Sequence, residues 1–239
     1  MFLNVFKNLF SQKSKQIEEY DPLKYDVEKE LEKYQNMLER GELDDISNYR
    51  LGKIYQYKGE RKLAIQSYHK VLNVNPSDGR THYNLAMIYF EENKFNEALE
   101  QFKKAVKYDS RNPNVHNGLG NTYLKLGYFD KALVSYKNSL KLDKENIYAH
   151  LGTGHVHFEK KEYDRALEIY TKVIKRKALP EAYINIGNIY AARGKISSAI
   201  EEYNKALNIS SDDKKVYYNL GLAYSELHDF NKAIEFYKK

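Results

Sequence analysis

Residues 115–133 read VHNGLGNTYLKLGYFDKAL, and their glycines either cradle a phosphate or serve the packing of helices. A phosphate-binding glycine turn needs a strand before it and a helix that starts at the loop. Here His116, Leu119, Gly120 and Tyr123 fall at i, i+3, i+4 and i+7, which is one face of a single helix. The stretch therefore predicts a packing notch at Gly120 and not an active site.

A corner follows this helix at LGYFD, residues 126–130. Gly127 can take the positive φ that commonly ends a helix. Beyond the corner, a second helical face carries Ala132, Leu133, Tyr136, Leu140 and Leu142. The stretch and the residues after it thus predict a helical hairpin.

The hairpin pattern recurs along the chain. The small residue of the first helix recurs at spacings of 34, 34, 34, 33 and 34 residues, as Gly52, Ala86, Gly120, Gly154, Gly187 and Gly221. Twelve residues after each of these stands an alanine: Ala64, Ala98, Ala132, Ala166, Ala199 and Ala233. Four residues further on stands an aromatic: Tyr68, Phe102, Tyr136, Tyr170, Tyr203 and Tyr237. Ladders that stay in phase over six units predict an all-α solenoid of about six helical hairpins.

The turns between units are rich in turn and helix-capping residues, as in NPSDG at 75–79 and SSDD at 210–213. They place the six units at 45–78, 79–112, 113–146, 147–179, 180–213 and 214–239, the last one truncated. Before them, residues 21–44 predict a capping helix that starts at Asp21-Pro22. Its apolar stripe is Leu31, Tyr34, Met37 and Leu38.

On these residues the chain resembles the tetratricopeptide repeat (TPR) family, whose unit has 34 residues. Leu, Gly and Tyr of the family's first helix, and Ala and an aromatic of its second, stand in this chain as in LGNTY at 119–123. The resemblance covers about 45–239 and implies a right-handed α-solenoid. It also implies that partners bind on the concave face, which the first helices line. It says little about which partner, because repeat scaffolds serve many unrelated pathways.

Departures from the family pattern are small. The family's tryptophan is replaced by Asn48, His82, His116, His150, Tyr183 and Tyr217. The fourth unit has Thr153 and His157 in place of Leu and Tyr, and it is one residue short before Pro180, which predicts a local change of superhelical pitch. We expect Gly120 to face Ala132, and Gly118, outside the ladder, to weaken its helix locally.

Composition argues against several classes of function. The chain has 39 basic and 33 acidic residues, and its net charge of +6 is spread along its length, so we expect no nucleic-acid partner. There is no cysteine for a disulfide, a thiolate metal site or a nucleophile. The seven histidines include His150, His155 and His157, which lack the i, i+4 spacing of a helical metal site. We expect no metal, no cofactor and no enzymatic activity.

The binding face predicted from the resemblance lies opposite the packed Leu/Tyr stripe of each first helix. Asparagines on such a face can pair with a peptide backbone, and aromatics supply contact area at low entropy cost. The candidate residues are Tyr49, Lys53, Tyr83, Met87, Phe90, Asn117, Asn121, Leu151, His155, Ile184, Asn188 and Tyr218. Some TPR proteins clamp a chaperone-tail carboxylate with a Lys followed by an Asn one turn later, and no unit here has that pair. An asparagine ladder at Asn84, Asn185 and Asn219 is broken by Arg50, Gly118 and Gly152.

We therefore expect a non-catalytic scaffold or adaptor that binds a partner-protein peptide in its concave groove. One alternative is a membrane-associated assembly factor anchored by residues 2–10, and another is the substrate-binding arm of a larger enzyme. The anchor would use the apolar side chains of Phe2, Phe6, Leu9 and Phe10. No stretch approaches the ~20 apolar residues of a membrane span and no secretory signal is evident, so we expect a cytoplasmic chain, membrane-associated in the alternative. The last helix stops at Lys239 without a polar cap, which leaves self-association through that end open.

Overall fold

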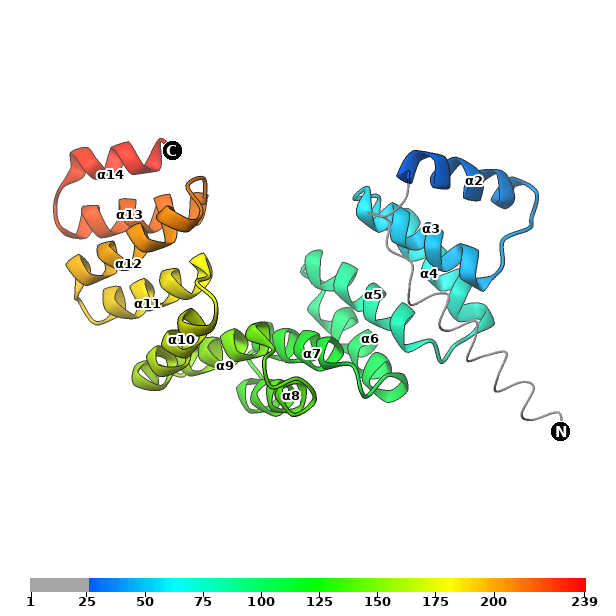
Figure 1. The fold of residues 1–239 in the computed structure, drawn as a ribbon, viewed down its shortest axis with the longest axis horizontal. Coiled ribbons are helices and arrows are strands. Elements are labelled where there is room, and N and C mark those ends of the chain that lie inside the picture. The colour runs from blue at the N-terminus through cyan, green and yellow to red at the C-terminus, as the bar shows by residue number, and fades with distance from the viewer. Residues whose placement is uncertain (1–25) are drawn as a thin grey trace. The chain divides into compact units, whose positions relative to one another are not determined.

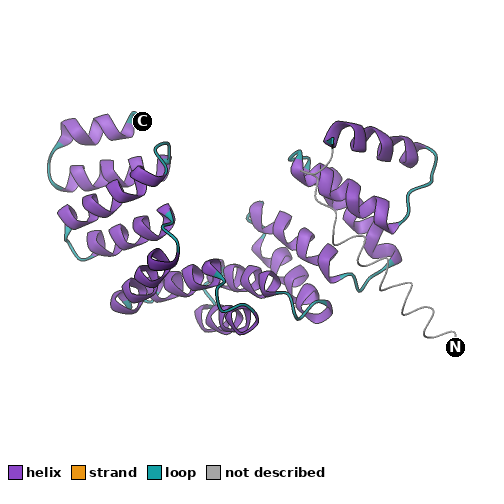
Figure 2. Cartoon of the chain, viewed as in Figure 1, coloured by secondary structure: helices purple, strands orange, loops and turns teal. Residues whose placement is uncertain are grey.

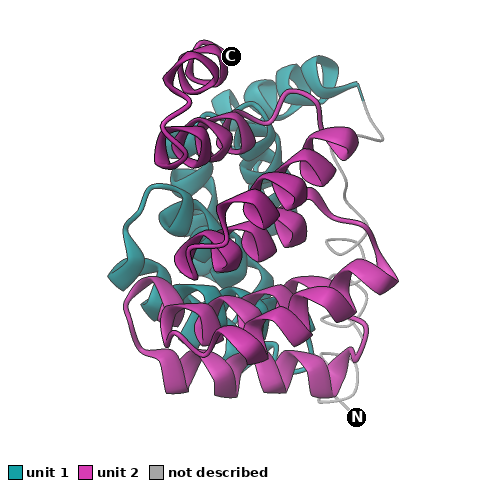
Figure 3. Cartoon of the chain, turned by 90° about the vertical axis from the view of Figure 1, so that its left-hand side faces the viewer, with its two compact units in different colours: residues 1–122 teal, residues 123–239 magenta. Residues whose placement is uncertain are grey.

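The chain is described here from a computed structural model, which covers residues 26–239. Within that range it is all helical, with thirteen helices and no strand (Figures 1 and 2). The chain divides into two compact units, residues 1–122 and 123–239 (Figure 3). The prediction of an all-α solenoid of about six hairpins is confirmed.

The first unit begins with a single helix and continues with helical hairpins. Its helices are α2 (Val27–Glu39), α3 (Asp45–Tyr57), α4 (Arg61–Val74), α5 (Gly79–Glu91), α6 (Phe95–Tyr108) and α7 (Pro113–Lys125), which runs on into the second unit. Leu31 and Tyr34 of α2 belong to the hydrophobic core that α3, α4 and α5 also form. Helix α2 starts after its N-cap residue Asp26, and the predicted start at Asp21-Pro22 lies outside the described residues.

The second unit repeats the hairpin in the same way. Its helices are α8 (Phe129–Leu142), α9 (Ile147–Glu159), α10 (Tyr163–Arg176), α11 (Pro180–Ala192), α12 (Ile196–Ile209), α13 (Lys214–Glu226) and α14 (Phe230–Tyr237). One core cluster joins α9, α10 and α11, and the next joins α11, α12 and α13. Within this unit, the first helices α9, α11 and α13 each pack against the second helix of their own hairpin and against the preceding second helix.

Every hairpin turns through a corner residue with positive φ. These residues are Gly59, Asn93, Gly127, Lys161, Gly194 and His228, with φ between 59° and 77°. The next backbone N–H always donates to the carbonyl five residues before it, as from Tyr128 to Tyr123 at 2.9 Å. This bond closes the end of the first helix in the manner of a Schellman motif. The positive φ predicted at Gly127 is confirmed at 76°.

Glycines in the first helices make room for aromatic rings. A Cβ atom on Gly52, Gly154, Gly187 or Gly221 would lie 2.4–2.5 Å from the tyrosine ring sixteen residues later in the same hairpin. In these four hairpins the ladder glycine therefore faces the aromatic, whereas the prediction for the third hairpin paired Gly120 with Ala132.

Gly118, for which only a local weakening of its helix was predicted, also has a packing role. A Cβ atom there would lie 2.4 Å from the ring of Phe102, in the preceding hairpin. Gly152 leaves the same space for the ring of Tyr136, because a Cβ atom on it would lie 2.3 Å from that ring. This position, two residues before the ladder glycine, is a second packing notch because the preceding hairpin's ring enters there.

Histidines that replace the family's tryptophan form hydrogen bonds with the turns between repeats. Nε2 of His82 donates to the carbonyl of Pro76 at 3.0 Å, and Nε2 of His116 donates to that of Ser110 at 2.9 Å. Nε2 of His150 lies 3.1 Å from the carbonyl of Lys144 and 2.8 Å from Nη1 of Arg176, so its tautomer decides which of the two bonds forms. His82 and His116 are buried, and His82 has both ring nitrogens in hydrogen bonds, which agrees with the packing role predicted for them.

Candidate functional site

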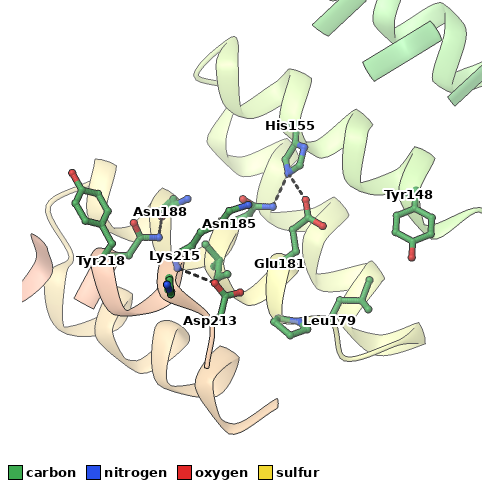
Figure 4. Close-up of a pocket in the computed structure, with 13 residues that line it drawn as sticks. Tyr148, His155, Leu179, Glu181, Asn185, Asn188, Asp213, Lys215 and Tyr218 are labelled. Atoms are coloured by element: carbon green, nitrogen blue, oxygen red, sulfur yellow. Dashed lines mark hydrogen bonds and ion pairs between the residues drawn. The ribbon is translucent and has the colours of Figure 1, made fainter. Parts of the chain in front are cut away.

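An open groove of about 780 Å³ lies in the second unit, and Figure 4 shows the side chains that line it. Three successive first helices, α9, α11 and α13, line it. Its side chains include Tyr148 and His155 from α9, Ile184, Asn185 and Asn188 from α11, and Tyr218 and Asn219 from α13. The turns before α11 and α13 add Leu179 and Asp213 to its rim. Two further hollows share His155, Asn185, Asn188 or Asn219 with it, so the polar floor is continuous.

Hydrogen bonds within and between neighbouring repeats order the amides of this floor. Nδ2 of Asn185 donates to Nε2 of His155 at 2.7 Å. Oδ1 of Asn188 accepts from the hydroxyl of Tyr203 at 2.8 Å and from Nδ2 of Asn219 at 3.3 Å. Each asparagine therefore uses one end of its amide within the protein.

His155 is a titratable group that lines the groove and bonds to its asparagine floor. Burial lowers the pKa of its imidazole, and the nearby cation Lys125 lowers it further. Glu181, whose Oε1 lies 3.7 Å from Nε2, and Glu159 oppose this effect. Burial outweighs these carboxylates, so the ring is neutral at neutral pH and accepts the bond from Asn185.

The aromatic ladder lies beneath the floor, and its hydroxyls have different partners. Tyr203 donates to Asn188, and burial raises the pKa of Tyr203 to about 12. Tyr170 is fully buried beside the ring of His155, with centroids 5.8 Å apart, and burial raises its pKa as well. The Tyr170 hydroxyl has no hydrogen-bond partner among residues 26–239.

Four of the twelve predicted binding residues come together in this groove: His155, Ile184, Asn188 and Tyr218. Tyr218 is the most open of them, with 58% of its surface exposed. Leu151, also on α9, is 2% exposed and belongs to the core between α9, α10 and α11. Ile184 takes part in the next core cluster as well as in the groove wall.

The other predicted residues lie in the first unit. Tyr49 is buried in its core, and the rings of Tyr83 and Phe90 lie against Phe102 and Phe95 of the following helix. The remaining residues are half-buried: Lys53, Met87, Asn117 and Asn121. Their role in binding remains a prediction.

Several groove residues escaped the binding-face prediction. Asn185 and Asn219 had been noted as parts of a broken ladder, and the structure brings both to the groove floor beside Asn188. Tyr148 and Glu181 lie in the first turn of their helices, away from the repeating inner positions. An aromatic or charge in the first turn of consecutive first helices is the signal that could have found them.

The remaining candidates are a metal site and a membrane segment, and the described residues support neither. Within residues 26–239 no three His, Asp or Glu side chains gather as a metal site. Nor is any helix in that range long and apolar enough to cross a membrane. The candidate anchor residues Phe2, Phe6, Leu9 and Phe10 lie outside the described range, so membrane association remains a prediction.

Comparison with known proteins agrees with this architecture. A family model described as TPR repeat matches residues 87–127, 120–161 and 187–228. A second, described as Tetratricopeptide repeat, matches residues 47–78 and 147–178. The chain therefore belongs to the tetratricopeptide repeat family. Comparison with curated protein sequences gives no match.

Solved structures share the fold. A tetratricopeptide repeat protein from Parabacteroides merdae is 18% identical at a TM-score of 0.76, over 89% of this chain and 91% of its own. YrrB, described as a TPR protein with an unusual peptide-binding site, is 22% identical at 0.59, over 77% and 95%. MamA is 28% identical at 0.59, over 69% and 97%. TPR proteins are in general interaction modules, and the fold supports such a role here.

Proposed function

We propose that this chain is a non-catalytic scaffold that binds an extended peptide segment of a partner protein in the groove of α9, α11 and α13. Holding that segment would assemble the partner into a complex. The observation that carries the proposal is the continuous floor of half-used asparagine amides. No hydrogen bond among the described residues reaches Oδ1 of Asn185 or Nδ2 of Asn188.

Such groups suit a peptide backbone, which offers one N–H donor and one C=O acceptor at each residue. The walls supply apolar contact through Leu179, Pro180 and Ile184. Tyr148 and Tyr218 are 65% and 58% exposed and can lie against ligand side chains at low entropy cost. YrrB, with its described peptide-binding site, gives a precedent on the same fold.

The test starts from a random 12-residue peptide library displayed on phage and selected on the full chain. We expect enriched peptides whose affinity falls about tenfold in Tyr218→Ala, because an exposed aromatic anchor is lost. Asn188→Leu should weaken binding by a similar factor, since it removes a donor and leaves Tyr203 unpaired.

The chain offers a matched control for each variant. Tyr57 is 57% exposed on α3 of the first unit, so Tyr57→Ala removes a comparable ring. Asn204 is exposed on α12, a second helix, and Asn204→Leu repeats the asparagine change outside the groove. Failure to enrich any peptide, or equal losses in variants and controls, would contradict the proposal.

A further inference from the structure

The two central asparagines of the groove are held in opposite orientations. Nδ2 of Asn185 is committed to Nε2 of His155 at 2.7 Å, so this amide offers Oδ1, an acceptor, to the groove. Oδ1 of Asn188 is committed to Tyr203 and Asn219, so this amide offers Nδ2, a donor. Three residues apart on α11, Asn185 and Asn188 lie on one face of the helix.

We propose that His155 and Tyr203 act as positioning residues that make the groove directional, and that protonation of His155 reverses one of its two contacts. The ligand then places an N–H opposite Asn185 and a C=O opposite Asn188. This inference rests on the proposed function, because it specifies how the same groove orients a bound peptide. It makes hydrogen-bond polarity, and not charge, the property by which the groove selects its ligand.

The reversal follows from the chemistry of the imidazole. A neutral ring accepts at Nε2, whereas the imidazolium carries a proton on both nitrogens and can only donate. At 2.7 Å from a protonated Nε2, the Asn185 amide can no longer donate to the ring. We expect it to turn its Oδ1 to the ring and its Nδ2 to the groove, with Glu181, 3.7 Å from the same nitrogen, as the competing acceptor. The groove would then present two donors in place of an acceptor and a donor.

The groups around His155 set where the change occurs. Glu181 comes from α11, Glu159 from its own helix, Lys125 from α7, and the buried phenol of Tyr170 from α10. The start of α13 brings Asp213, Lys214 and Lys215 to the same groove. Burial and Lys125 lower the pKa of His155, so the acceptor is present above that lowered pKa and is lost as the pH falls through it.

The first measurement needs no ligand. In the uniformly ¹⁵N/¹³C-labelled full chain, titrated downward from pH 8, we expect the side-chain amide signals of Asn185 to shift with the same midpoint as the ring of His155. His155→Gln should abolish the shift, because its side chain does not titrate. His69→Gln, at an exposed histidine on α4, should preserve it. An Asn185 signal that ignores the titration of His155 would overturn the proposal.

The second measurement uses a peptide enriched from the phage library as the probe. Its affinity should fall about fivefold as the pH is lowered from above to below the His155 midpoint found in the first measurement, the size expected for one exchanged hydrogen bond, and stay constant for His155→Gln. Methylation of one backbone nitrogen of the peptide should cause a similar loss. If no peptide is enriched, the proposed function fails while the amide titration still decides this inference. A bound peptide that shows the same pH dependence in His155→Gln would overturn the inference alone.

Discussion

At the scale of single residues, packing depends on glycines in the first helices that leave space for aromatic rings of the second helices. Gly118 and Gly152 receive the rings of Phe102 and Tyr136 from the preceding hairpin, whereas Asn185 occupies the same repeat position in the fifth unit. The choice between glycine and asparagine there decides whether a hairpin offers a packing notch or a polar group. Sequence spacing located the ladder glycines, four of which face a tyrosine ring and not the alanine predicted opposite Gly120. It missed this second notch because Gly118 breaks the visible repeat.

Gly118→Ala should destabilise the first unit by about 1–3 kcal/mol, the usual cost of overpacking. The added Cβ atom meets the Phe102 ring at 2.4 Å, and both atoms lie in a buried contact. Urea denaturation followed by circular dichroism measures the change. Phe102→Leu in the same chain should recover part of the loss, and an alanine variant as stable as the wild type would contradict the proposed notch.

The hydroxyl of Tyr170, which has no hydrogen-bond partner in the described part of the chain, leads to a second residue-scale prediction. Tyr203→Phe should cost about 1 kcal/mol because it removes the bond to Asn188, whereas Tyr170→Phe should be neutral or stabilising. The two rings occupy the same ladder position, so each variant serves as the control for the other. Thermal unfolding compares them directly, and equal destabilisation would show that Tyr170 has a partner after all.

At the scale of elements, the hairpin corner is the best predicted feature of the fold. Alternating helical faces and Gly127 sufficed to predict two helices and the left-handed residue between them. Asn93, Lys161 and His228 occupy the same corner in other hairpins with φ of 59°, where no glycine marks the turn. The helices on either side impose the positive φ at these residues. The residue type alone does not predict this conformation, so only the position in the repeat reveals it.

Lys161→Gly should therefore stabilise the second unit by about 1 kcal/mol, because it relieves a side chain from the left-handed region. The reverse change, Gly194→Ala, should destabilise the same unit by a similar amount, since φ there is 72°. A Cβ atom on Gly194 meets no other atom within 4 Å, so this control isolates the backbone effect. Chemical denaturation of both variants checks the opposite signs, and a destabilised glycine variant would contradict the account.

At the scale of the whole molecule, six similar hairpins supply different surfaces. The inner face of the first helices was predictable from the repeat, and His155, Ile184, Asn188 and Tyr218 do line one groove in the second unit. Which of these inner residues stay accessible was not predictable from the repeat. Leu151 and Tyr49 are buried, although they occupy the same repeat position as the exposed Tyr218. The pairing of Asn185 with His155 depends on packing between repeats and has no trace in either repeat alone.

Photo-crosslinking tests the central claim, that the second unit's groove holds the peptide, most directly. A library-selected peptide carrying a benzophenone group is irradiated with the full chain, and the attached residues are identified by mass spectrometry. The account predicts attachment on the inner sides of α9, α11 and α13, with Tyr148 and Tyr218 foremost. Attachment confined to residues 26–122, or to the second helices α10, α12 and α14, would contradict it.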